Sequence, residues 1–200
     1  MSDVEAAVAA LRAGKLAIVP TDTVYGLAAR ADSEAPARRL YRAKGRDELQ
    51  PTALVASGLE TLFEWLPELH GRAAAVVNVL LPGSYTLILP NPARRYPWLT
   101  GDRPQTLGVR VPQLAGPGGD VLAALGAMVA TSANLPGRQD PRRLEDVPRE
   151  LCDAVAAIVD GGELPGTPST VIDLTGHEPR VVREGAVTAE EALRVVGSVL

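Results

Sequence analysis

The sequence predicts one α/β domain over residues 1–200, with a twisted, mixed sheet and flanking helices. Short apolar segments of strand length alternate irregularly with segments of helical apolar spacing, and no break in composition marks a second domain. Hydrophobic residues make up 46% of the chain, which is enough to fill one core, while aromatic residues make up only 4%. We therefore expect a core of Val, Leu, Ala and Ile.

The expected elements follow from local patterns. Apolar spacing of three to four residues predicts helices at 3–13, 34–43, 59–66, 71–81, 120–126, 144–155 and 188–198, the last with a capping-box pattern at Thr188 and Glu191. Apolar runs predict strands at 16–20, 52–56, 84–90, 106–112, 127–131 and 156–160, and a hairpin-like pair at 170–174 and 180–184. Gly- and Pro-containing segments predict a turn at 116–119, loops at 44–51, 132–141 and 161–169, a loop or short helix at 91–104, and a functional loop at 21–32 that leads into another strand.

Composition excludes several classes of protein. The net charge of −4 argues against broad electrostatic binding of nucleic acid, although it leaves room for a local basic groove. No apolar run approaches the ~20 residues of a membrane span, and the acidic, amphipathic N-terminus is unlike a signal peptide, so a cytoplasmic location is expected. Cys152, His70 and His177 are the only Cys and His residues, which argues against a metal site built from such side chains.

Two cations flank a glycine at Lys44-Gly45-Arg46, directly after a predicted helix. One interpretation is a polyphosphate clamp, with Lys44 as a point charge and Arg46 as a bidentate fork. The alternative is that both cations only complement the carboxyl end of the helix dipole. Lys44 is one of two lysines in a chain that otherwise uses arginine, which favours a specific need for a lysine here.

Two arginines fall within or at the end of apolar strands, namely Arg110 in TLGVRVP and Arg183 in RVVRE. A guanidinium beside the core is costly unless it has a partner. Either an internal carboxylate pairs with it, or it awaits an anionic ligand such as a carboxylate, which the planar fork matches. The sequence leaves both alternatives open.

Small hydroxyl residues gather in loops that follow predicted strands. Thr21 and Thr23 alternate in PTDTVYG, Ser132 and Asn134 lie in TSANLPG, and Ser169 opens PSTVIDL. Strand ends are where ligand sites gather in α/β sheets. The alternative is that these are ordinary turns whose hydroxyls bond the local backbone.

In order along the chain, these segments resemble the threonylcarbamoyl-AMP synthase family with its YrdC-type domain, in the short form without an extra C-terminal domain. The matching segments are VPTDTVYGL (19–27), KGR (44–46), PG with Thr86 (82–86), LGVRVP (107–112), TSANLPG (131–137), DGG (160–162), PSTVIDL (168–174) and VREGAV (182–187). The resemblance implies a YrdC/RibB-like fold, with the twisted sheet and its helices around a deep, positively lined cavity.

The resemblance also implies an activity: ATP, L-threonine and bicarbonate give threonylcarbamoyl-AMP and pyrophosphate, the first step of threonylcarbamoyladenosine modification of tRNA. It implies catalytic roles for Lys44 and Arg46. Carried over position by position, it implies ATP-binding roles for Lys44, Arg46, Thr106, Ser132, Asn134, Asp140 and Arg183. It implies threonine-binding roles for Thr21, Thr23, Arg110, the backbone of Ala130, and Ser169. Mg²⁺ is expected to arrive with ATP, without a protein side chain as ligand.

Other functions remain open at this point. The chain would be an RNA-binding module if a local basic groove bound tRNA or ribosomal RNA, and the acidic balance speaks against that as the main role. A carbamoyl-transfer domain is a third candidate, because related domains occur in hydrogenase-maturation proteins, although those carry zinc-finger-like cysteines that this chain lacks. The family resemblance further implies transient contact with the downstream tRNA threonylcarbamoyl transferase complex.

Overall fold

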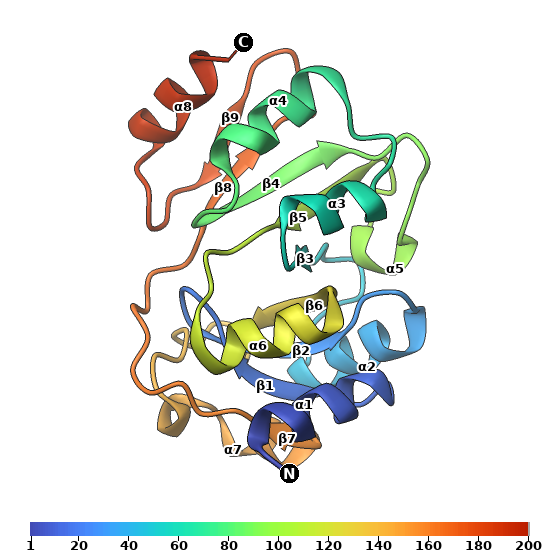
Figure 1. Cartoon of the computed structure of the whole chain (residues 1–200), viewed down its shortest axis with the longest axis vertical. Coiled ribbons are helices and arrows are strands. Elements are labelled where there is room, and N and C mark those ends of the chain that lie inside the picture. Colours follow the sequence, from blue (N-terminus) through green and yellow to red (C-terminus); the bar gives the residue numbers. More distant parts are fainter. Residues whose placement is uncertain (200) are drawn as a thin grey trace.

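Nine strands form one mixed sheet in the computed structural model, which describes residues 1–199 (Figure 1). The strands are β1 (Ala17–Pro20), β2 (Tyr25–Arg30), β3 (Leu54–Ala56), β4 (Tyr85–Pro90), β5 (Thr106–Arg110), β6 (Ala127–Ser132), β7 (Ala157–Ile158), β8 (Thr170–Asp173) and β9 (Arg180–Arg183). The helices are α1 (Asp3–Arg12), α2 (Glu34–Lys44), α3 (Leu59–Trp65), α4 (Gly71–Leu80), α5 (Pro97–Thr100), α6 (Gly116–Leu125), α7 (Arg149–Ala154) and α8 (Ala189–Gly197), with a 3₁₀ turn η1 (Leu144–Asp146). The predicted α/β class is confirmed.

The strand order is β7-β1-β2-β6-β3-β5-β4-β8-β9. Parallel pairs (β1 with β7, β3 with β5, β4 with β8) occur beside antiparallel ones, so the predicted mixed sheet is confirmed. β8 and β9 pair antiparallel, as the hairpin-like prediction requires. In Figure 1 the lower half of the molecule holds β1, β2, β6 and β7, and the upper half holds β4, β5, β8 and β9, with the two termini at opposite ends.

The lower half of the sheet is covered by helices on both faces. Along β1, Ala17 and Val19 belong to a cluster with side chains of α1 and α6, while Ile18 belongs to the main core cluster, which also holds Leu40 of α2. Because both faces are buried, the strand reads as a continuous apolar run rather than as an alternating one.

The upper half has one core face and one cavity face. Leu87 and Leu89 of β4 and Leu107 and Val109 of β5 are at most 2% exposed and pack in the core with α3 and α4. Successive strand residues point to opposite faces. The intervening residues Thr86, Ile88, Thr106, Gly108 and Arg110 therefore point the other way, and they line a cavity.

Three local expectations need comment. The predicted helix at 144–155 is wrong as one element, because Pro148 divides it into η1 and α7, and a proline restricts its preceding residue away from helix. The GPGG segment is not a separate turn but the first turn of α6, where Pro117 suits the first helical positions. At α8, the Thr188 hydroxyl accepts a hydrogen bond from the Glu191 N–H at 3.3 Å, which is the first half of the predicted capping box.

Candidate functional site

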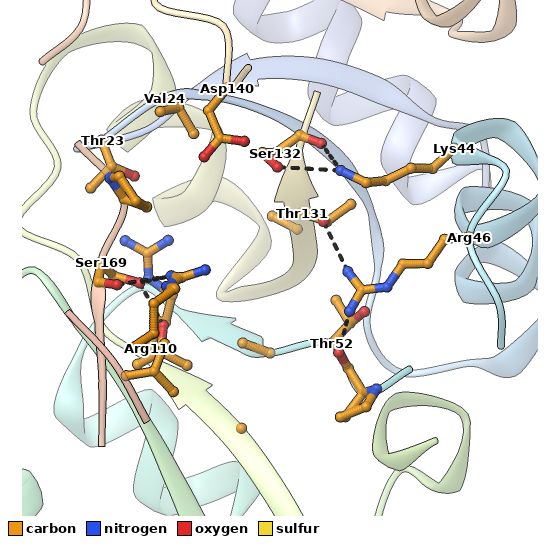
Figure 2. Close-up of a pocket in the computed structure, with 18 of the residues that line it drawn as sticks. Thr23, Val24, Lys44, Arg46, Thr52, Arg110, Thr131, Ser132, Asp140 and Ser169 are labelled. Carbon is orange, nitrogen blue, oxygen red and sulfur yellow. Dashed lines mark hydrogen bonds between the residues drawn. The ribbon is translucent and has the colours of Figure 1, made fainter. Parts of the chain in front are cut away.

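A cavity of about 480 Å³ lies where the two halves of the sheet meet, and Figure 2 shows it at close range. Its walls come from the end of α2, the exposed face of β4, β5 and β8, the end of β6, and the loop that follows β6. The volume falls within the ~300–1,000 Å³ that is usual for small-molecule sites.

The cavity is strongly positive within an acidic protein. Its charged lining residues are Lys44, Arg46, Arg103, Arg110 and Arg183, against Asp140 among residues 1–199. A concave site lined by one sign of charge focuses the field and raises the local concentration of counter-ions. The protein as a whole carries −4, so this local potential indicates an anionic ligand rather than a general affinity for polyanions.

Lys44 ends α2 and lines the cavity, and the left-handed Gly45 (φ 63°) ends the helix and turns the chain after it. The residue is 6% exposed. Its Nζ donates to the carbonyl oxygen and, at 3.2 Å, to the hydroxyl of Ser132, and at 2.8 Å to Asn134 Oδ1. Burial lowers the pKa of Lys44 to about 8, with Arg46 adding to the effect and Asp140 opposing it.

Arg46 follows on the same turn and crosses toward β6, as Figure 2 shows. Its Nη1 donates to Thr131 Oγ1 at 3.2 Å and its Nη2 to the Pro51 carbonyl at 2.6 Å. Burial lowers the pKa of its guanidinium, which stays charged at any working pH. Lys44 and Arg46 therefore present two fixed cations to one cavity.

Arg110 has an internal partner. Its Nη2 donates to Asp22 Oδ1 at 2.8 Å, and the two side chains are 16% and 7% exposed. Burial raises the pKa of Asp22, and the nearby Arg110 charge opposes that rise. Arg110 therefore has the internal carboxylate partner that the sequence left open. The same guanidinium also lines the cavity, so the ion pair leaves it accessible to a ligand.

Arg183, at the end of β9, reaches Ser169 from the side. Its Nη2 donates to the Ser169 carbonyl at 2.8 Å and lies 3.3 Å from the Ser169 hydroxyl. The Ser169 hydroxyl is also 2.8 Å from Thr86 Oγ1. Burial lowers the pKa of Arg183. A second guanidinium is thus held beside hydroxyl groups at the Arg110 end of the cavity.

Four buried side-chain polar atoms in residues 1–199 have no hydrogen-bond partner, and all belong to this site. They are Arg46 Nε, Thr52 Oγ1, Arg110 Nε and Asp22 Oδ2. Arg46, Thr52 and Arg110 line the cavity, and Asp22 pairs with Arg110. An unpaired buried polar atom costs about 1–3 kcal/mol. Their concentration at one place is typical of a site that is shaped for a polar ligand.

Thr21 and Thr23 differ in their placement. Thr23 lines the cavity, whereas Thr21 does not. The Thr21 hydroxyl donates to the Val24 carbonyl at 2.6 Å and accepts from the Thr23 and Val24 N–H groups at 3.2 Å. For Thr21, the alternative of a hydroxyl that bonds the local backbone matches the observed contacts, and a ligand-binding role stays a prediction.

The structure brings together eleven of the twelve predicted site residues, and their individual binding roles stay predictions. The lining includes Thr23, Lys44, Arg46, Thr106, Arg110, Ala130, Ser132, Asn134, Asp140, Ser169 and Arg183. The sequence did not predict as site residues four others that line the cavity, Thr52, Thr86, Arg103 and Thr131, or Asp22, which pairs with Arg110. Three of them could have been found from the sequence, because Asp22 lies between the two predicted threonines and Thr86 and Thr131 lie in segments that match the family. Nothing in the local sequence marks Thr52 or Arg103 as a site residue.

The remaining candidate groups lie elsewhere. Cys152 is half-buried in α7, and burial raises the pKa of its thiol, which disfavours the reactive thiolate. His70 and His177 are exposed, as predicted. Within residues 1–199, no three His, Cys, Asp or Glu side chains are grouped to hold a metal ion. In that same part of the chain, no helix has the length and apolar character needed to cross a membrane.

An α/β domain with a cation-lined cavity, formed here by strand faces together with the end of β6 and the loop after it, is typical of proteins that bind anionic small molecules. Comparison with known proteins is more specific. The sequence signature of the Sua5/YciO/YrdC family, described as "Telomere recombination", matches residues 9–185. A putative threonylcarbamoyl-AMP synthase of Mycobacterium tuberculosis is 33% identical over 192 residues, covering 96% of this chain and 88% of that protein.

Solved structures agree with the sequence comparison. Pyrococcus abyssi Sua5 complexed with L-threonine matches with a TM-score of 0.87 and 31% identity, covering 100% of this chain and 59% of that one. E. coli YciO matches with a TM-score of 0.80 and 30% identity, covering 95% of this chain and 92% of that one. This chain belongs to the Sua5/YciO/YrdC family, which includes threonylcarbamoyl-AMP synthases.

Proposed function

We propose that this chain forms threonylcarbamoyl-AMP and pyrophosphate from L-threonine, bicarbonate and ATP, the first step of threonylcarbamoyladenosine modification of tRNA. The observation that carries the proposal is one cavity that holds Lys44, Arg46 and Arg110 in a chain matching synthases over nearly its full length. Two anionic substrates, a polyphosphate and an amino-acid carboxylate, need cations at two places. The cavity offers both.

The amino acid lies at the Arg110 end. Arg110 binds the threonine carboxylate through the part of its guanidinium that Asp22 leaves free, while Ser169 and Thr23 supply hydroxyls to the polar groups around it. The neutral amine nitrogen attacks the bicarbonate carbon to form the C–N bond, and the bicarbonate hydroxyl leaves as water with the proton that the amine gives up, so that N-carboxythreonine forms. A site shielded from bulk water protects this labile carbamate.

The nucleotide lies at the Lys44 end. Lys44 and Arg46 hold the phosphates, so that a carbamate oxygen faces the α-phosphorus. That oxygen forms the new P–O bond, and the bond between the α-phosphorus and the bridging oxygen breaks with its electron pair going to pyrophosphate. Cations fixed beside the leaving group stabilise the charge that develops there. No covalent protein nucleophile is needed, and holding the reactants in line contributes about 7–11 kcal/mol.

Magnesium fits the site only as a companion of the triphosphate. Among residues 1–199, Asp140 is the one carboxylate in the cavity lining, too few for a dedicated cage. When bound, Mg²⁺ would be held mainly by the phosphates and would neutralise their charge, and Asp140 is the carboxylate of the lining that could help to hold it. The cytoplasmic location and the contact with a downstream transferase complex stay predictions.

Pyrophosphate release tests the proposal. The wild-type chain is assayed with ATP, Mg²⁺, threonine and bicarbonate, and then with threonine and bicarbonate omitted in turn. We expect release only in the complete mixture, and its abolition by Arg46→Ala. Arg42→Ala is the matched control, because Arg42 lies in the last turn of α2, shortly before Arg46, is exposed and does not line the cavity. Release that ignores threonine would refute the proposal, and a pure RNA-binding module would release none.

A further inference from the structure

Gly108, in the middle of β5, is a glycine that the protein itself does not require. Its φ lies outside the positive region, so its conformation is open to any residue. The three atoms nearest to a Cβ built at this position all belong to Ala53 and lie 3.5 Å or more away, which is ordinary van der Waals distance. A glycine inside a strand weakens it and often marks a place where a ligand approaches the backbone closely.

Four other glycines that lie at or near cavity residues in the sequence are explained by the protein. Gly45 and Gly137 near the cavity have positive φ angles. Gly83 and Gly185 face backbone atoms, where a Cβ would lie 2.6 Å and 2.1 Å from a carbonyl oxygen. Gly108 has neither explanation, and it lines the cavity. What remains to explain a glycine here is the cavity itself, because a side chain at this position would occupy part of it.

That space lies between the two ends of the proposed site. Thr106, Gly108 and Arg110 alternate along β5, so all three face the cavity. Each neighbour is two residues away, about 7 Å along the strand. Ile88 pairs directly with Gly108 across the β4–β5 ladder and lines the cavity too. A side chain at 108 would stand on the cavity floor between Arg110, which the proposed function gives to the threonine carboxylate, and Thr106, which the family resemblance gives to the nucleotide.

We propose that Gly108 sets the depth of the cavity floor at the point where the two substrates react, so that the carbamate and the α-phosphate lie directly against its backbone. Gly108 is then a positioning residue, acting by leaving space rather than by a chemical group. The inference rests on the proposed function, since it assigns a place to the reacting groups of that reaction.

Gly108→Ala tests the inference through three readouts: the Tm, the kcat for pyrophosphate release, and the Kd for threonine alone. We expect an unchanged or raised Tm, because alanine fits here and restricts the unfolded chain. We expect at least a tenfold fall in kcat, with the Kd for threonine changed by less than threefold. Gly108→Val should lower kcat further.

Gly197→Ala is the matched control. A Cβ at Gly197 meets no atom within 4 Å, and the residue lies in α8, outside the cavity. This variant should keep its activity and, because alanine again restricts the unfolded chain, keep or raise its Tm.

The outcomes are separable. Full activity of Gly108→Ala, beside an active wild type, would overturn the inference and leave the proposed function standing. A collapsed Tm would show that the protein itself needs the glycine, which also overturns it. A loss of threonine affinity as large as the loss of kcat would place the bound amino acid, not the reacting groups, over Gly108. An inactive wild type would remove the proposed function and this inference together.

Discussion

Raising the pH should weaken ATP binding by neutralising Lys44. Its ammonium is 6% exposed, and burial together with the neighbouring Arg46 lowers its pKa to about 8. A phosphate-binding lysine must be protonated, and the terminal phosphates of ATP are already ionised above pH ~7. Between pH 7 and pH 9 the change in charge therefore falls on Lys44 rather than on the ligand.

The size of the effect follows from the pKa. With a pKa of about 8, Lys44 is about nine-tenths protonated at pH 7 and about one-tenth protonated at pH 9. If only the protonated form binds the phosphates, the Kd for ATP rises about tenfold over that interval, which corresponds to about 1.4 kcal/mol. Isothermal titration of a non-hydrolysable ATP analogue at the two pH values measures it.

Lys44→Arg is the control, because a guanidinium stays charged throughout this range. Its Kd should be higher at pH 7, since the three acceptors around Nζ suit an ammonium, but nearly flat up to pH 9. A wild-type Kd that stays within twofold between pH 7 and pH 9 would refute the reasoning. So would an equal rise in Lys44→Arg, because titration would then lie elsewhere.

Three further predictions address the rest of the account. Arg110→Ala should raise the KM for threonine at least tenfold and lower the free energy of unfolding, because it leaves Asp22 buried without its partner; adding Asp22→Asn should restore stability, measured by urea denaturation, but not the KM. Recovery of both by the double variant would mean that Arg110 serves only as an ion-pair partner. Tyr25→Phe should lower the free energy of unfolding by about 1–2 kcal/mol in the same urea experiment, with kcat retained. The Tyr25 hydroxyl lies outside the cavity, is shared as donor between Asp160 Oδ1 and the Gly162 carbonyl, and accepts from the Gly161 N–H, all within 2.9 Å. An unchanged urea midpoint would contradict a stabilising role for these hydrogen bonds. Chelating Mg²⁺ should stop pyrophosphate release while leaving the Kd for threonine unchanged, and release that persists in excess chelator would count against metal-assisted ATP binding.

Local patterns were enough to predict much of the fold. β1 is buried on both faces and reads as a continuous apolar run, and alternation along β5 puts Leu107 and Val109 in the core. An arginine in such a strand signals either an ion pair or a ligand; Arg110 forms an ion pair with Asp22 and also lines the cavity, and its ligand stays a prediction. The predicted single helix at 144–155 was wrong because of a proline. Pro148 separates the short 3₁₀ turn η1 from helix α7.

The cavity itself could not be built from spacing. Asp22 and Arg110 are separated by 88 positions in the sequence, and Lys44 and Ser132 by the same number. Only the order of strands in the sheet brings such pairs together. Arg103 precedes β5 in a loop with several arginines nearby, and nothing in its local pattern distinguishes it as a cavity residue. The family resemblance supplied the grouping that local physics could not.

The central claim is that one cavity joins threonine, bicarbonate and a nucleotide. Mass spectrometry of the nucleotide product formed from ¹³C-bicarbonate, ¹⁵N-threonine and ATP tests it most directly. The account predicts an AMP adduct that carries both labels in equal amount, formed together with pyrophosphate. An adduct with the nitrogen label alone, or AMP with no adduct, would contradict it.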